Sequence, residues 1–142
     1  MKGYWNQPEA SEEVLKERNN KIWYKTGDLG YVSNNYLYYQ GRKSDNYKLS
    51  NGKFVNVLSV ENKIKQYLKG NFIIHGDNME YNIIITDQKI EDSTLNLINS
   101  QLESYLHIKD TYVIDTDKMS GFLTPKMSIK RKALIAYYNK HN

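Results

Sequence analysis

Two charged side chains, an acidic one on a glycine turn and a basic one further along the chain, have types suited to binding one polar ligand. Asp28 lies in the run Lys-Thr-Gly-Asp-Leu-Gly at residues 25–30, and Arg42 lies in the run Gly-Arg-Lys-Ser-Asp-Asn-Tyr-Lys at residues 41–48. A carboxylate accepts hydrogen bonds from two neighbouring hydroxyls, and a guanidinium supplies a rigid fork of donors. The pair therefore suits a sugar with vicinal hydroxyls, such as a ribose.

A β-hairpin is expected between these two side chains. Residues 31–33 and 36–39 are rich in tyrosine and flank Asn34-Asn35, a dipeptide that tolerates positive φ. Such a hairpin places Asp28 at one end of a rigid ribbon and Arg42 at the other end. Rigid mounting matters because recognition of a sugar depends on accurate placement of both groups.

The remaining pattern predicts short strands and amphipathic helices. Asn51-Gly52 is a strong turn signal, Pro8 fits a first helical turn, and Ser93 or Thr94 can cap a helix that carries Leu95, Ile98, Leu102 and Leu106. The predicted helices cover residues 8–18, 57–69, 93–106 and 130–139, and the predicted strands cover residues 22–24, 47–50, 53–56, 72–75, 81–86 and 112–114.

These elements predict an α+β fold. After residue 44 the order is hairpin, helix, strand, strand, helix, strand, helix, and each helix has one apolar stripe to bury. A small cap domain with a hairpin and a three-stranded sheet, packed by helices, satisfies that requirement.

Composition excludes several classes of function. The chain has 142 residues, 39% apolar content and no cysteine, which suits a folded chain and excludes a disulfide scaffold, a thiolate zinc site and a cysteine nucleophile. His75, His107 and His141 do not share the spacing of a metal site, so no metal ligand is predicted. No apolar run is long enough to cross a bilayer and no signal-peptide pattern is present, which predicts a cytoplasmic protein without a transmembrane segment.

Several blocks of the sequence together resemble the adenylate-forming, or AMP-binding, ligases. The blocks are Gly-Tyr-Trp-Asn-Gln-Pro-Glu-Ala at residues 3–10, Trp-Tyr-Lys-Thr-Gly-Asp-Leu-Gly at 23–30, Gly-Arg-Lys-Ser-Asp at 41–45 followed by Lys48, and Leu-Thr-Pro at 123–125. They stand in the family's order and spacing over essentially the whole chain. Residues 48–53 and 129–131 look most like long-chain fatty acyl-CoA synthetases.

The resemblance implies a two-step reaction in which an acid is joined to AMP from ATP and then passed to a thiol, commonly that of coenzyme A. It implies that residues 1–43 are the tail of a large AMP-binding domain and residues 44–142 a mobile C-terminal cap. ATP, Mg²⁺ and coenzyme A would be the cofactors, and fatty acid the substrate. The family's Gly-rich phosphate loop and its acid pocket are absent from this sequence, so a partner N-terminal adenylating domain is expected, in cis or in trans.

The resemblance also assigns roles to individual residues. Asp28 and Arg42 would hold the ribose, and Tyr39 would lie against the nucleotide. Ser44 stands at the family's hinge, where most members carry Asp or Lys. Lys48 and Gly52 fall in the region that serves the thioester-forming step.

The C-terminal block departs from the family at one position. Adenylation builds negative charge around the α-phosphate, so a positioned cation lowers the barrier, and the family supplies a lysine three residues after Thr-Pro. Here Ser128 occupies that position. In an extended chain Lys126 and Lys130 project to the same face as Ser128. Three hypotheses follow: Lys126 or Lys130 replaces the lysine, with Lys126 preferred; adenylation is impaired; or another cation is used.

Two other classes of function stay open. Ser128 in place of lysine favours a non-catalytic cap that docks on a separate adenylating domain or carrier protein. The basic cluster at residues 126–132 is the feature that a nucleic-acid binder would use, but aromatic and cationic residues are not interleaved along a strand there, so no nucleic-acid partner is predicted. Peripheral membrane attachment through a parent enzyme is the alternative to a purely cytoplasmic location.

Overall fold

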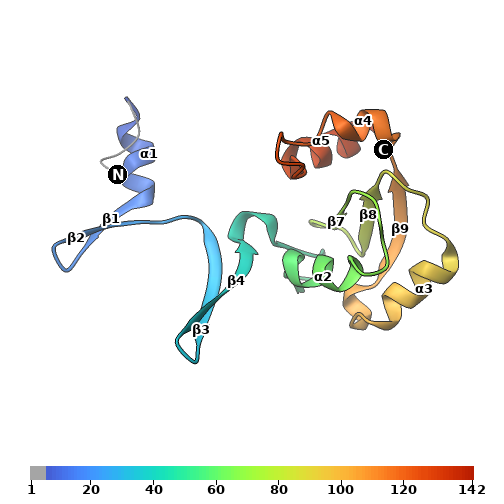
Figure 1. Cartoon of the computed structure of the whole chain (residues 1–142), viewed down its shortest axis with the longest axis horizontal. Helices are drawn as coiled ribbons and strands as arrows, with labels where there is room; N and C mark the ends of the chain where they lie inside the picture. The colour runs from blue at the N-terminus through green and yellow to red at the C-terminus, as the bar shows by residue number, and fades with distance from the viewer. Residues whose placement is uncertain (1–5) are drawn as a thin grey trace. The chain divides into compact units, whose positions relative to one another are not determined.

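The computed structural model describes residues 6–142, so residues 3–5 of the first resemblance block lie outside the described range. The chain divides into two units, Met1–Ser44 and Asp45–Asn142 (Figure 1). The first unit contains one helix, α1 (Pro8–Val14), followed by two β-hairpins. The first hairpin pairs β1 (Leu15–Arg18) with β2 (Lys21–Tyr24), and the second pairs β3 (Asp28–Ser33) with β4 (Tyr36–Arg42).

Both hairpins of the first unit turn on Asn-Asn dipeptides. Asn19 and Asn20 have φ of 54° and 57°, and Asn34 and Asn35 have φ of 50° and 66°. Two consecutive positive φ angles produce the tight turn whose twist matches that of paired strands. The prediction around Asn34-Asn35 is confirmed. The predicted helix over residues 8–18 is wrong beyond residue 14, because Asn19-Asn20 reverses the chain as a hairpin turn and residues 15–18 pair with β2.

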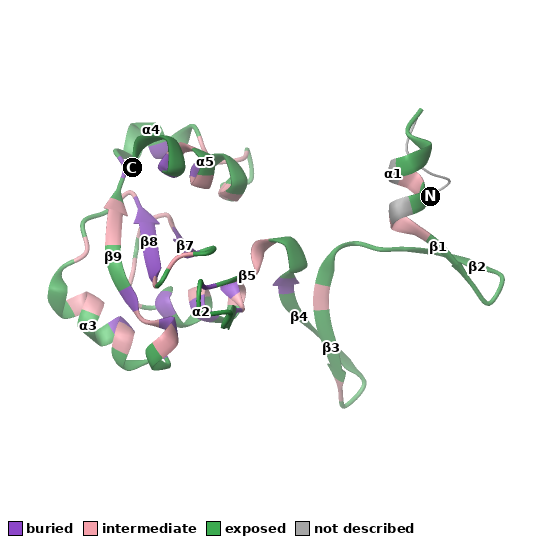
Figure 2. Cartoon of the chain, turned by 180° about the vertical axis from the view of Figure 1, so that it is seen from behind, coloured by how far each residue is buried: buried purple, intermediate pink, exposed green. Residues whose placement is uncertain are grey.

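The first unit has almost no buried interior. Among its described residues only Gly41 is buried, and Leu37 and Ile22 are 77% and 70% exposed (Figure 2). Isolated two-stranded hairpins are marginally stable in water. The apolar faces of this unit are therefore typical of a surface that packs against further protein.

The second unit is built on a three-stranded sheet. Its strand order is β7 (Phe72–His75), β8 (Asn82–Thr86), β9 (Ile108–Val113), with β7 antiparallel and β9 parallel to β8. A short hairpin of β5 (Tyr47–Lys48) and β6 (Phe54–Val55) precedes the sheet. The α-helices of this unit are α2 (Val57–Ile64), α3 (Asp92–Ser100), α4 (Thr116–Ser120) and α5 (Arg131–His141), and the 3-10 segments are η1 (Lys43–Asp45), which begins before the unit boundary, and η2 (Ser104–Leu106).

Alternation along the strands creates two apolar layers. Ile74 and Ile84 pack on one side with residues of α2 and α3, whereas Ile73, Ile83 and Ile85 pack on the other side with residues of α4 and α5. All five residues of β8 are buried, as expected for a central strand covered on both faces (Figure 2). The predicted α+β class with a three-stranded sheet is confirmed.

Several predicted elements in this unit differ from the structure. The helix at residue 57 ends at Ile64 rather than Lys69, because a tight turn after Ile64 carries Tyr67 and Leu68 onto the core. The helix predicted over residues 93–106 ends at Ser100, so Leu102 lies beyond it and Leu106 lies in η2. The strand predicted at residues 112–114 begins at Ile108, since the Asn99 side chain bonds both the N–H and the C=O of Ile108 at 2.8 Å. Helix α4 was not predicted.

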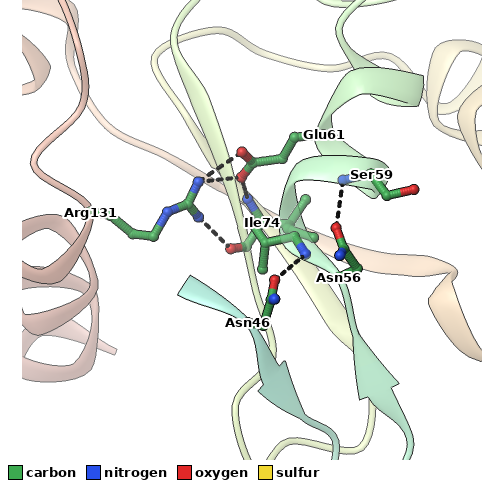
Figure 3. A network of polar contacts seen from close by, with 7 residues as sticks. Asn46, Asn56, Ser59, Glu61, Ile74 and Arg131 are labelled. Atoms are coloured by element: carbon green, nitrogen blue, oxygen red, sulfur yellow. Dashed lines mark hydrogen bonds and ion pairs between the residues drawn. The ribbon is translucent and has the colours of Figure 1, made fainter. Parts of the chain in front are cut away.

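One ion pair closes the free edge of the sheet (Figure 3). The Arg131 Nη2 lies 2.7 Å from both carboxylate oxygens of Glu61, and both side chains are more than four-fifths buried. Glu61 also accepts the Ile74 N–H at 2.9 Å, and Arg131 Nη1 donates to the Ile74 C=O at 3.3 Å. The outward N–H and C=O of Ile74 in β7 are thus satisfied by side chains of α2 and α5 instead of by another strand.

Two asparagines cap the start of α2. The Asn56 side chain accepts the Ser59 N–H, and the Asn46 side chain accepts the Val57 N–H, both at 2.9 Å (Figure 3). These bonds satisfy N–H groups that a helix leaves without internal partners. Asn46 therefore ties the segment that follows η1 to the helix that carries Glu61.

None of the helices within residues 6–142 combines the length and the apolarity needed to span a bilayer.

Replacing Arg131 by methionine is expected to lower the free energy of unfolding by about 3 kcal/mol, because Glu61 is left buried without its partner. Urea denaturation of the full chain followed by circular dichroism measures this. Lys132→Met, one residue along and exposed, is the matched control and should change stability by less than about 0.5 kcal/mol. A double variant Glu61→Leu/Arg131→Met should be more stable than Arg131→Met alone; an equal loss would show that the ion pair does not set the cost.

The stability of the chain should fall as the pH drops below 6.5, the ordinary value for histidine. His75 is buried with its ring edge-on to Tyr47 and Tyr138, and burial lowers the pKa of His75. At such pH the His75 side chain is protonated more readily in the unfolded chain than in the folded chain, so lowering the pH favours unfolding. His75→Phe should flatten this part of the profile of melting temperature against pH, whereas the control His141→Gln should not; an unchanged slope in His75→Phe would exclude His75 as the cause.

Candidate functional site

A register shift in the β3–β4 hairpin decides which side chains share a face. Asp28 lies directly opposite Arg42, so the prediction that the two stand at opposite ends of the ribbon is wrong, and Gly30 lies opposite Tyr39. Two residues of β3 therefore span the same stretch as three residues of β4, which is a β-bulge, and Gly41 within it has φ of 94°. Only glycine adopts such a φ without strain.

The bulge brings three side chains to one face. Residues directly opposite each other in an antiparallel pair point to the same side, and Asp28 and Gly30, two apart in β3, also share a side. Tyr39 and Arg42 consequently lie on the face of Asp28. Without the extra residue in β4, Tyr39 and Arg42 would point to opposite faces.

Asp28 and Arg42 form an open ion pair. The Arg42 Nε lies 3.5 Å from Asp28 Oδ1, and the two side chains are 64% and 38% exposed, respectively. Among the described residues, Asp28 Oδ2 and the terminal nitrogens of Arg42 have no protein partner. An exposed pair of this kind contributes little to stability. The pair offers a free carboxylate oxygen as an acceptor beside free N–H donors. Two neighbouring hydroxyls of a ligand can bind both groups.

Local hydrogen bonds fix the backbone that leads into Asp28. The Asp28 N–H donates to Thr26 Oγ1 at 3.1 Å, and Gly27 between them has φ of 78°. The Gly27 C=O accepts the Lys43 N–H at 2.9 Å, so the open end of the hairpin is closed next to the ion pair. The Thr-Gly-Asp turn therefore holds the carboxylate at a defined place on the ribbon.

Gly30 leaves room beside Tyr39. A Cβ at Gly30 would lie 2.8 Å from the Tyr38 carbonyl oxygen, so no larger residue fits without movement of the backbone. On the opposite face Tyr31 and Tyr38 stack with ring centroids 5.0 Å apart. The Asp28 face thus combines an aromatic ring with polar groups, and the opposite face carries the Tyr31–Tyr38 stack.

Three further residues with predicted roles are exposed on the surface: Ser44, Lys48 and Gly52. Ser44 is exposed in η1, and the division between the two units falls directly after it. Lys48 is an exposed residue of β5 whose C=O accepts the Asn78 N–H at 2.9 Å. Gly52 has φ of 81° in the following turn, with open space where a Cβ would lie. The roles of these three residues remain predictions.

The C-terminal block is a tight turn and not an extended strand. Leu123 bridges to Ile129, Thr124 N–H donates to the Ser128 C=O at 2.8 Å, and the Met127 N–H donates to the Thr124 C=O at 2.8 Å. Met127 has φ of 60°. Lys126 and Lys130 would project to the face of Ser128 in an extended chain. Because the chain turns here, that prediction is wrong.

The two lysines occupy different positions around this turn. Lys126 is exposed at its tip, after Pro125, and Lys130 is the N-cap residue of α5, with its N–H bonded to the Phe122 C=O at 2.6 Å. The Ser128 N–H donates to Thr124 Oγ1 at 3.1 Å. Lys126 is therefore the cation carried by the most open part of the block.

Within residues 6–142 no three histidine, aspartate or glutamate side chains gather in a way that could hold a metal ion. No metal site is assigned to this part of the chain.

The sequence did not predict the β4 bulge, helix α4, the Glu61–Arg131 pair or the turn at Met127. The Glu61–Arg131 pair joins residues far apart in the chain, and the only signal for it was a charged residue on each of two predicted amphipathic helices. Met127 at positive φ was hidden because glycine and asparagine, not methionine, usually mark such a position.

No family model matches the chain. The D-alanine–D-alanyl carrier protein ligase of Bacillus mycoides is 26% identical over 148 residues, which cover 94% of this chain and 28% of that protein. A chloroplastic long-chain-fatty-acid–[acyl-carrier-protein] ligase of Arabidopsis thaliana is 23% identical over 170 residues, covering 99% of this chain and 23% of that protein. The chain thus spans less than a third of the length of either relative.

The fold recurs in solved structures. The adenylation domain of a carboxylic acid reductase from Segniliparus rugosus, in complex with AMP and a co-purified carboxylic acid, superposes with a TM-score of 0.78 at 21% identity. The match covers 97% of this chain and 25% of that chain. This chain resembles the C-terminal part of an adenylate-forming ligase.

The narrower prediction of a long-chain fatty acyl-CoA synthetase is not confirmed. One relative is named for D-alanine and its carrier protein, and the other for a long-chain fatty acid and an acyl carrier protein. Similarity to both supports the ligase family and leaves the acid and the acceptor thiol to proposal.

Replacing Met127 by glycine is expected to raise the free energy of unfolding by about 0.5–1 kcal/mol, because glycine removes the strain of a positive φ and loses part of that gain to unfolded-state entropy. Lys126→Gly at the neighbouring position, where φ is not positive, should instead lower it slightly. Chemical denaturation of the two variants measures the difference. A loss of stability in Met127→Gly would contradict the geometry of this turn.

Proposed function

We propose that this chain is the C-terminal part of an ATP-dependent ligase that activates a carboxylic acid as an acyl adenylate and transfers it to a thiol. Residues 1–43 form the tail of the adenylating domain, residues 44–142 form the mobile cap, and Ser44 is the hinge. The observation that carries the proposal is the bulged hairpin that presents Asp28, Arg42 and Tyr39 on one face.

The hairpin is the ribose site in this proposal. The Asp28 carboxylate accepts hydrogen bonds from the 2′- and 3′-hydroxyls, and the Arg42 guanidinium donates to the oxygens of the same hydroxyls. Tyr39 lies against the nucleotide on the side of Gly30. The protein-protein contact between Asp28 and Arg42 is a single 3.5 Å approach, so both groups can turn to a ligand at little cost.

The partner of the first unit is the remainder of an adenylating domain, in the same polypeptide or in a separate one. Its strands expose apolar residues on both hairpins, including Ile22, Trp23, Val32 and Leu37. Surfaces of this kind are usually covered by other protein. The phosphates of ATP, with Mg²⁺, are then held by that domain, since the Gly-rich loop is absent from this sequence.

Lys126 is the cation proposed for the adenylation step, with Lys130 as the second choice. An ammonium on an exposed turn reaches a phosphate of a bound nucleotide without first breaking an internal ion pair. A second function, a non-catalytic cap that docks on an adenylating domain or carrier, is favoured by one observation: Ser128, which has no amine, occupies the position of the family's lysine.

The acceptor proposed is a pantetheine thiol, the group shared by coenzyme A and carrier proteins. Coenzyme A with a long-chain fatty acid follows from the resemblance at residues 48–53, with Lys48 and Gly52 serving the transfer step. A carrier protein is supported by the names of the two relatives. Loading assays with both acceptors distinguish them.

A chimera tests the proposal. This chain replaces the aligned C-terminal part of the Bacillus mycoides ligase, and D-alanine-dependent ATP–pyrophosphate exchange is measured. Asp28→Ala and Arg42→Ala should each lower exchange about tenfold to a hundredfold, because a charged hydrogen bond to the ribose is lost. Lys21→Ala, an exposed residue of β2, is the control.

The same chimera separates catalysis from docking. Lys126→Ala should abolish most of the exchange activity and leave transfer from supplied D-alanyl adenylate to carrier or coenzyme A intact. Exchange that is absent in the unaltered chimera but restored by Ser128→Lys would replace the catalytic proposal with the non-catalytic cap. Full exchange activity in both Asp28→Ala and Arg42→Ala would reject the ribose site.

A further inference from the structure

A groove of about 380 Å³ opens on the second unit, and the turn that carries Lys126 supplies two of its lining residues, Met127 and Ile129. It lies between α2, the segment that leads into β7 and the turn that precedes α5. Its apolar walls are formed by Leu58, Leu68, Phe72, Met127 and Ile129. A volume near the lower end of the range for small-molecule pockets suits a ligand of modest size.

Met127 makes this groove unusual. It is 69% exposed although apolar, and the turn holds it at φ of 60°. Leu58, Leu68, Phe72 and Ile129 are only partly buried, and Asn62, Gly70 and Asn71 also line the groove, so its wall mixes apolar and polar surface open to solvent. Methionine adapts its shape to irregular apolar partners, which suits a flexible hydrocarbon.

The charge in the groove is positive. Lys65 and Lys69 line it, and neither forms an ion pair with any residue in the described range. The one acidic residue of the lining, Glu61, is held by both of its oxygens to Arg131 at 2.7 Å. Two uncompensated ammonium groups therefore stand beside an apolar wall.

We propose that this groove binds an amphiphilic anion, a medium-length hydrocarbon chain that ends in a carboxylate or a phosphate. The chain lies along Leu68, Phe72 and Met127, and the head group lies between Lys65 and Lys69. Contact with the apolar side chains supplies most of the affinity, and the two ammonium groups select a negatively charged head group. The groove is lined by residues of the second unit and by none of the residues proposed for the ribose, so binding of the amphiphile is measured without nucleotide.

The test uses the full chain and decanoate, followed by amide chemical shifts below the critical micelle concentration. Saturable shifts are expected at Leu58, Lys65, Lys69, Phe72 and Ile129. Decyltrimethylammonium, with the same chain and the opposite charge, should bind at least about tenfold more weakly. Decyl phosphate binding tighter than decanoate assigns the natural head group to a phosphate, and the reverse assigns it to a carboxylate.

Matched variants locate the contacts. Lys65→Gln/Lys69→Gln should weaken decanoate binding about tenfold, whereas Lys63→Gln/Lys132→Gln, with the same loss of charge outside the groove, should not. Met127→Ser, at an exposed position, should weaken decanoate and the cationic amphiphile alike. The proposal is overturned by equal affinity for the two amphiphiles or by an unchanged affinity for decanoate in Lys65→Gln/Lys69→Gln. An acidic helical peptide is titrated as an alternative ligand, and shifts with this peptide but none with decanoate would also overturn it.

Discussion

The ion pair between Glu61 and Arg131 is the interaction on which the second unit depends. A sheet of three strands leaves β7 with unpaired backbone groups, and the pair satisfies both of those at Ile74 while joining α2 to α5. Burial raises the pKa of Glu61, and the guanidinium and the Ile74 N–H oppose that rise. Because Arg131 is the first residue of α5, the same contact fixes where the preceding turn with Lys126 and Met127 leaves the core.

The first unit works by a different constraint, the bulge in β4. Its one extra residue sets the face on which Arg42 and Tyr39 stand, and the Thr-Gly-Asp turn brings Asp28 to the same place. The hairpin has no core of its own, so its geometry depends on backbone pairing and on asparagine and glycine at positive φ. A preformed polar face on an otherwise apolar ribbon is the arrangement that an adenylate-forming ligase would need at its sugar site.

Sequence predicted most elements because their signals are local. Asn34-Asn35 specified a hairpin, and the apolar stripe of each predicted helix indicated helices packed on a small sheet. The same dipeptide at Asn19-Asn20 predicts a helix end, since residues 15–18 contain good helix formers and their partner strand lies across the turn. The β4 bulge, the Glu61–Arg131 pair and the turn at Met127 were not predicted, because each depends on contacts between residues apart in sequence or on a φ that the residue type does not reveal.

We propose that Asp28 and Arg42 hold a ribose through its two hydroxyls. The most direct measurement is a double-mutant cycle in which AMP and 2′,3′-dideoxy-AMP are titrated into the full chain and into Asp28→Ala, with binding read from amide shifts of the β3–β4 hairpin. We expect the unaltered chain to bind AMP more tightly than 2′,3′-dideoxy-AMP and Asp28→Ala to bind the two equally. Equal affinity of the unaltered chain for the two nucleotides would contradict it.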